Sequence, residues 1–136
     1  MLDIRHTVRA SSPNIPFEKI ARAILGTRFE LSLVVCGDTL AQKMNKQYRQ
    51  KTYKPNVLSF PLNKNEGEIF LNVRKAGREA RRFQLSEREW LAHLFVHGCF
   101  HLKGLDHGRI MEANERRIMR RFGYSCKSGQ ASSSPL

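Results

Sequence analysis

Short apolar runs bounded by polar or glycine positions predict strands and helices in alternation through the first half of the chain. Residues 30–36 form the clearest strand, because branched apolar side chains crowd into a short run. The polar residues 63–67 predict a turn between two further strands. The expected strands are residues 2–8, 30–36, 56–60 and 68–71.

Helical patterns dominate the second half of the chain. Ser86 and Glu89 have the spacing of a capping box, which predicts that a helix begins there. Earlier, Asp38 or Thr39 is positioned to cap a helix that runs to about Tyr48. The expected helices are residues 16–25, 38–48, 73–83, the helix opened by Ser86, and residues 109–122.

This order of elements predicts an α+β domain, with a small mixed sheet of about four strands covered by about five helices. The helix opened by Ser86 is apolar nearly all round, from Trp90 to Leu102. That pattern is typical of a central, buried helix. Such a helix can hold metal ligands rigidly in a partly dry cavity, in the manner of the zincin metal helix.

Three histidines and a glycine predict a metal site at the end of this helix. His97 and His101 are four residues apart, so they project from one helix face. Gly104 can end the helix, since glycine accepts left-handed backbone angles, and His107 then comes within reach. Three nitrogen ligands with an open fourth position are typical of catalytic zinc. We therefore expect one Zn²⁺ ion on His97, His101 and His107, rather than a layer of imidazoles that each need a separate hydrogen-bond partner.

The spacing matches the three-histidine part of the metzincin protease motif, with one difference. A zincin has a glutamate directly after its first histidine, where it acts as general base. Gly98 occupies that position. Peptide hydrolysis by that mechanism is therefore disfavoured, although a metal ion can still polarise a phosphoryl oxygen.

Neighbours of the motif have expected positions as well. Asp106 is a candidate catalytic residue that can assist proton transfer, but orienting an imidazole or capping the turn is the favoured role. His93 precedes His97 by four residues, and the 40° drift of each such step favours a group that supports a ligand or lines the pocket over a fourth ligand. Cys99 lies about 200° round the helix from His97 and should face the core.

Length and composition fit one domain. The 136 residues are 40% hydrophobic and 26% charged, which suffices for a single core. Neither a secretory signal nor a transmembrane run is apparent. The three cysteines, Cys36, Cys99 and Cys126, are odd in number and widely spaced, which predicts free thiols in a reducing cytoplasm. We expect the domain over residues 1–124 and a mobile, Ser-rich tail over residues 125–136.

A formal net charge of +12 points to a polyanionic partner. Nucleic acid is favoured over a membrane surface, because no segment combines a basic face with large exposed aromatics. Basic residues gather in three places beside the motif, which favours a phosphate-binding surface over three merely solvated faces. The clusters are Lys43, Lys46, Arg49, Lys51 and Lys54; Arg74, Lys75, Arg78, Arg81 and Arg82; and Arg116, Arg117, Arg120 and Arg121.

Three residues of the first cluster region carry specific hypotheses. Arg49 is either one more surface cation or the group that holds a scissile phosphate, since its planar fork matches phosphate oxygens. Tyr48 and Tyr53 either pack in the core or stack on unpaired bases, and packing is favoured for Tyr48.

Several segments together resemble one family. Residues 97–107 resemble the His-Gly-x-x-His-Leu-x-Gly-x-Asp-His signature of the YbeY endoribonucleases of bacteria. Further similarity covers residues 45–49, 56–61, 67–71, 111–115 and 122–124. Leu105 stands where the family often has an aromatic residue, Glu68 replaces the commoner aspartate, and the segment between Pro61 and Gly67 is short. None of these differences removes a histidine of the motif.

The resemblance implies a metal-dependent endoribonuclease that prefers single-stranded RNA. It implies a role in maturation and quality control of ribosomal RNA and association with the small ribosomal subunit. It further implies His97, His101 and His107 as zinc ligands, and Arg49 as the functional arginine facing the metal. The alternatives are a non-catalytic, zinc-stabilised RNA-binding factor of ribosome assembly and, less favoured, a zinc metalloprotease.

Overall fold

Four strands form one mixed sheet in the order β1-β2-β4-β3. The computed structural model describes residues 1–9 and 14–125. The central pair β2 and β4 is parallel, β1 extends it in parallel, and β3 pairs antiparallel with β4 at the other edge. The strands are β1 (Leu2–His6), β2 (Glu30–Cys36), β3 (Val57–Asn63) and β4 (Glu66–Asn72).

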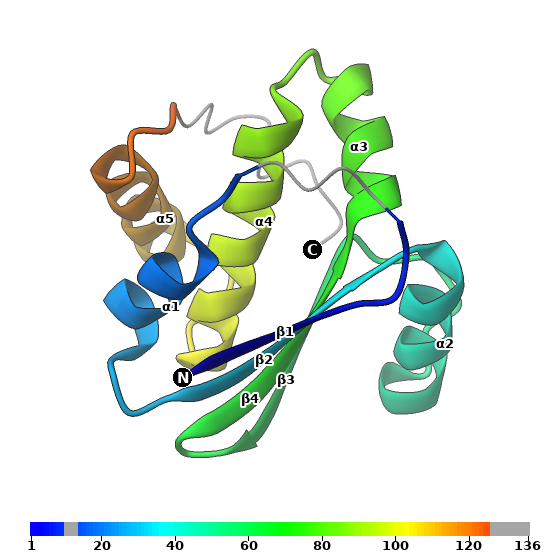
Figure 1. Cartoon of the computed structure of the whole chain (residues 1–136), viewed down its shortest axis with the longest axis horizontal. Coiled ribbons are helices and arrows are strands. Elements are labelled where there is room, and N and C mark those ends of the chain that lie inside the picture. The colour runs from blue at the N-terminus through cyan, green and yellow to red at the C-terminus, as the bar shows by residue number, and fades with distance from the viewer. Residues whose placement is uncertain (10–13, 126–136) are drawn as a thin grey trace.

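Helices cover both faces of this sheet, but unequally. The larger hydrophobic core lies between one face and α1, α3, α4 and α5, whereas α2 alone packs on the other face with a smaller cluster. Figure 1 shows α2 on the opposite side of the sheet from the other four helices. The helices are α1 (Phe17–Leu25), α2 (Asp38–Arg49), α3 (Val73–Arg82), α4 (Glu87–Leu102) and α5 (Arg109–Arg121).

The alternation of side chains along β2 explains the two cores. Leu31 and Leu33 point into the larger core, and Val34 and Cys36 point toward α2. Because both faces are covered, this strand is apolar on nearly every position, which is the continuous run seen in the sequence.

Helix α4 is the centre of the larger core. Every residue from Trp90 to Phe100 is buried, as the apolar pattern predicts. The Ser86 hydroxyl accepts a hydrogen bond from the backbone N–H of Glu89 at 3.3 Å, so the predicted helix start is confirmed.

Gly98 allows α4 to approach the sheet closely. The Ser59 hydroxyl donates a hydrogen bond to the Gly98 carbonyl at 2.9 Å. A Cβ atom at this position would lie 3.0 Å from Ser59 Oγ, 3.2 Å from Ile69 Cδ1 and 3.3 Å from Val57 Cγ2. The side of α4 directly after His97 therefore packs tightly against β3 and β4, and a larger side chain would require these neighbours to shift.

The loop between α2 and β3 is held by hydrogen bonds to five successive carbonyl groups. Gln42 and Asn45 of α2 donate to the carbonyls of Thr52 and Tyr53, at 2.7 and 3.0 Å. The carbonyls of the next three residues accept from the Lys75 ammonium, the Asn72 side chain and the Asn72 backbone N–H. These bonds fix the segment that joins the end of α2 to the edge strand.

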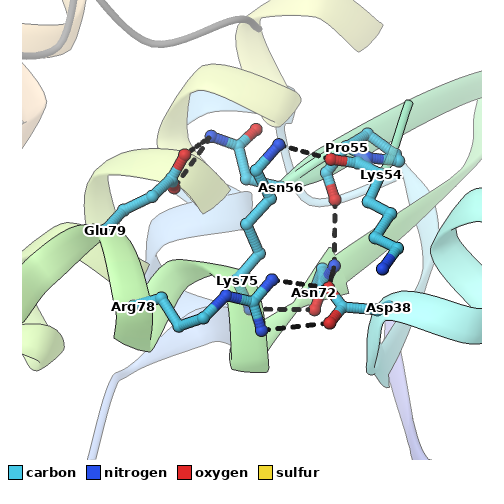
Figure 2. Close-up of polar contacts among 8 residues, drawn as sticks. All are labelled: Asp38, Lys54, Pro55, Asn56, Asn72, Lys75, Arg78 and Glu79. Carbon is cyan, nitrogen blue, oxygen red and sulfur yellow. Dashed lines mark hydrogen bonds and ion pairs between the residues drawn. The ribbon is translucent and has the colours of Figure 1, made fainter.

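Asn72 connects this loop to two helices (Figure 2). Its amide donates to Asp38 Oδ1 at 3.0 Å and to the Pro55 carbonyl at 3.1 Å, and its Oδ1 accepts from the backbone N–H of Lys75 at 3.1 Å. Asp38 also receives two hydrogen bonds from the Arg78 guanidinium, at 2.9 and 3.0 Å. The hydrogen bond from Arg78 is the main cause that lowers the pKa of Asp38 to about 2.

The predicted α+β class, with a mixed four-stranded sheet and five helices, is confirmed for the residues that the structure describes. The predicted cap of α2 by Asp38 or Thr39 is wrong, because Gly37 is the N-cap and makes no side-chain cap bond. The carboxylate of Asp38 is instead bound to Asn72 and Arg78. The predicted turn at 63–67 is too long, because both strands extend through polar residues that pair by their backbones.

Some predictions lie outside what the structure describes. Residues 126–136, which include Cys126, are outside the described residues, so the tail at 125–136 and the domain boundary at 124 stay predictions. Cys36 and Cys99 are free and buried. Over residues 1–9 and 14–125, each helix is too short or too polar to cross a membrane.

We expect Asn72→Ala to lower the free energy of unfolding by about 2–4 kcal/mol, measured by urea denaturation. The substitution removes the cap of α3 and leaves the buried Pro55 carbonyl without its partner. Asn63→Ala in the exposed hairpin is the matched control and should cost less than about 1 kcal/mol. Equal losses for the two variants would contradict the central role of Asn72.

Candidate metal centre

Three imidazoles converge where α4 ends. His97 and His101 come from the last turns of α4, and His107 comes from the loop before α5. Their ligand nitrogens all lie within 4.8 Å of one another, and the Nε2 atoms of His97 and His101 are 3.0 Å apart. The loop turns back through Gly104 at a φ of 99°, as its glycine predicts.

Glu115 of α5 fixes the orientation of the first histidine. Its Oε2 lies 2.5 Å from His97 Nδ1, and its Oε1 lies 3.2 Å from His93 Nε2. An ionised carboxylate only accepts hydrogen bonds, so His97 must donate through Nδ1. That choice leaves the lone pair on Nε2, which is the nitrogen that faces His101.

The protonation states suit metal binding. Burial favours the neutral form of Glu115, but hydrogen bonds from His93 and His97 outweigh it and lower the pKa of Glu115 to about 2. Burial, together with repulsion from His97 and His107, lowers the pKa of His101 to about 4. His101 is therefore neutral at pH 7 and has a nitrogen lone pair to offer.

The donor set fits a zinc ion. Three nitrogens that are each about 2.0–2.1 Å from a tetrahedral ion lie about 3.4 Å apart, close to the separation of His97 and His101 here. The three side chains supply three of four tetrahedral positions, as in sites that leave one position for water or substrate. Cobalt and nickel also bind imidazoles, so the geometry supports a metal ion without choosing among them.

A cavity of about 260 Å³ adjoins the three histidines. Its wall includes the start of edge strand β3, from Val57 to Ser59, and the side chain of Arg49 at the end of α2. Arg49 Nη1 donates a hydrogen bond to the Tyr53 hydroxyl at 3.4 Å. The cavity therefore brings together groups from both sides of the sheet, at the edge where β3 ends the layer.

The other predicted residues lie in different positions. Asp106 is exposed, directly before His107, and is not among the residues that line the cavity, so its catalytic role stays a prediction. His93 contacts Glu115, which also contacts His97, and it is not part of the three-histidine group, so it is no fourth ligand, as predicted; it does not line the cavity. Cys99 is fully buried, as predicted. Packing of Tyr48 in the core is wrong, because its side chain is 60% exposed.

Most residues of the basic clusters are exposed, and Lys75 and Arg116 are half-buried. The side chains of Val73, Ala76 and Ala80 on α3, and of Ile118 and Met119 on α5, are buried on the opposite faces. Arg49 alone among the clustered residues lines the cavity. The others lie outside the cavity, where Arg78 is paired with Asp38 and the Lys75 ammonium donates to the Lys54 carbonyl.

Sequence reasoning missed Glu115 and Ser59. Glu115 was visible only as one acidic residue within the family-like segment 111–115. It follows Met111 by four residues and lies on the same, inner face of α5. That spacing places a charged residue on the apolar face of the helix, which is a signal by which Glu115 could have been found. Ser59 was visible only as part of the family-like segment 56–61, because its contact with Gly98 depends on how α4 packs on β3.

Fold and site together define a small α+β protein with three histidines that could hold a metal ion. The chain matches the model of the family described as "Endoribonuclease YbeY" over residues 7–123. It belongs to the endoribonuclease YbeY family, which confirms the resemblance seen in the sequence.

Individual relatives agree. The Endoribonuclease YbeY of Methylobacillus flagellatus is 35% identical over 116 residues, which cover 79% of this chain and 78% of that protein. The one of Methylibium petroleiphilum is 33% identical over 125 residues, covering 86% and 84%. A solution structure of a protein from Thermotoga maritima has a TM-score of 0.65 at 21% identity, over 99% of this chain and 94% of that one, and it supports the fold.

We expect Glu115→Gln to weaken zinc binding by about 10- to 100-fold, because the amide cannot accept from both imidazoles and no longer fixes His97. Chelator competition on the purified protein measures the affinity. Glu112→Gln, on the same helix, is the matched control and should bind zinc like the unchanged protein. Equal affinities for the two variants would contradict the orienting role of Glu115.

Proposed function

We propose that this protein is a zinc-dependent endoribonuclease that cleaves single-stranded RNA. The observation that carries the proposal is the convergence of His97, His101 and His107 beside Arg49 in one cavity. Its relatives are named Endoribonuclease YbeY, and this site has the groups that phosphodiester cleavage needs. They are a set of metal ligands and a fixed cation for the phosphate.

The side chains have separate tasks in this proposal. His97, His101 and His107 would hold the ion, which when bound supplies Lewis-acid polarisation of a phosphoryl oxygen. Arg49 binds a second phosphate oxygen through its planar fork and stabilises the negative charge that grows in the transition state. The hydrogen bond from Arg49 to Tyr53 restricts the guanidinium before substrate arrives.

The cavity wall offers no carboxylate as a general base among the described residues that line it. The nucleophile is therefore either a water molecule or the 2′-hydroxyl of the RNA itself. The product ends distinguish these routes, because only attack by the ribose leaves a 2′,3′-cyclic phosphate.

The basic faces support a long polyanionic substrate. With a net charge of +12 and exposed Lys and Arg on α2, α3 and α5, the protein can hold a strand well beyond the cavity. We propose ribosomal RNA as that substrate, in its maturation and quality control, with the small ribosomal subunit as partner and the cytoplasm as location. The same basic faces favour the alternative, a zinc-stabilised assembly factor that binds RNA without cutting it.

A metalloprotease is disfavoured by the packing of α4. The general base of a zincin would stand at position 98, where a Cβ atom would lie 3.0 to 3.3 Å from side-chain atoms of Ser59, Ile69 and Val57, so these side chains would have to shift to admit a glutamate.

We expect His101→Ala and Arg49→Glu each to reduce cleavage of a defined single-stranded RNA by at least about 100-fold, while circular dichroism shows a folded protein. Lys43→Glu makes the same charge change elsewhere on α2 and is the matched control, which should retain most activity. If Arg49→Glu cleaves like Lys43→Glu, Arg49 has no catalytic role. If the unchanged protein binds RNA and never cleaves it, the assembly-factor alternative replaces this proposal.

A further inference from the structure

Tyr48 presents an aromatic ring to solvent on a rigid support. Its side chain is 60% exposed, although α2 has a buried face that could have received it. The ring packs against Phe60 at a centroid distance of 5.4 Å, and Phe60 packs against the buried Phe70 at 5.8 Å. A tilted contact with Phe60, which in turn meets Phe70 edge to face, therefore supports Tyr48 on one side and leaves most of its surface exposed.

This ring adjoins the metal cavity through two chain segments. Tyr48 directly precedes Arg49, and its neighbour Phe60 directly follows Ser59. Arg49 and Ser59 both line the cavity. A phosphate bound at Arg49 would therefore have its neighbouring nucleoside within reach of the Tyr48 ring.

Tyr53 has a different environment. Its side chain is 38% exposed, its hydroxyl accepts the hydrogen bond from Arg49, and the Lys75 ammonium lies 6.0 Å from its ring centroid. Tyr53 thus contacts Arg49 of the site and Lys75 outside the cavity, and Tyr48 is the ring that is left open to a ligand.

We propose that Tyr48 stacks on an unpaired nucleobase next to the scissile phosphate, which deepens the proposed function and rests on it. Exposed Lys46, Arg49 and Lys51 surround it in the sequence and can bind the flanking phosphates. Every base has a π-face, so the contact is tolerant of sequence. A paired base has its faces covered by its neighbours in the helix, so this contact selects single strands.

Binding is measured with a single-stranded RNA that contains 2-aminopurine, in a His101→Ala background to prevent cleavage. Adding Tyr48→Ala should weaken binding by about 5- to 150-fold, which is the range expected for loss of one base stack. The quenching of 2-aminopurine fluorescence on binding should also disappear. Tyr48→Phe and Tyr48→Trp should bind within about 2-fold of the background, because they keep the π-face. Ile110→Ala removes another exposed apolar side chain and should change nothing.

A second arm replaces each base of the RNA in turn by an abasic residue. One position should weaken binding to the Tyr48-containing protein as much as Tyr48→Ala does, and the two losses should not add. Unchanged RNA binding by Tyr48→Ala, or additive losses at every position, would overturn the stacking role, and the exposed ring would then serve a partner other than RNA.

Failure of the unchanged protein to cleave RNA would overturn the proposed function independently, because the stacking measurement does not require turnover.

Discussion

A buried carboxylate between two imidazoles is the constraint on which the candidate site depends. Burying a charge is costly unless it is paired, and Glu115 is paired twice, to His93 and His97. The same pair of contacts docks α5 against α4 in a core that is otherwise apolar. Stability and site geometry are therefore coupled. The hydrogen bond from His97 Nδ1 stabilises the buried Glu115 carboxylate, and it also leaves Nε2 as the nitrogen that His97 can offer to a metal.

The position of the cavity follows from the sheet order. β3 is an edge strand, so its start is reachable both from the face that α4 covers and from the face that α2 covers. The histidines arrive from the first face and Arg49 from the second. Hydrogen bonds from α2 and from Asn72 at the start of α3 to the loop carbonyls hold the segment that follows Arg49. Gly98 sets the distance between α4, which carries His97 and His101, and the sheet.

The class of fold and the three-histidine group were predictable from local patterns in the sequence. Residues 30–36 read as a buried strand, and the serine that caps α4 identified the start of that helix, because these signals depend on neighbours in the chain. The cap of α2 was mispredicted because Asp38 is bound by Arg78, forty residues away. Glu115 was missed and the exposure of Tyr48 was mispredicted for the same reason, since both depend on packing between distant elements.

The three histidines are close in sequence, whereas their surroundings are not. All three fall within residues 97–107, so bringing them together requires only a short loop closure with a small entropic cost. Arg49 and β3 reach the same place only after long-range contacts between strands have formed. A measurement of metal content would therefore report on residues 97–107 and on Glu115, and not on whether Arg49 and β3 are in place at the cavity.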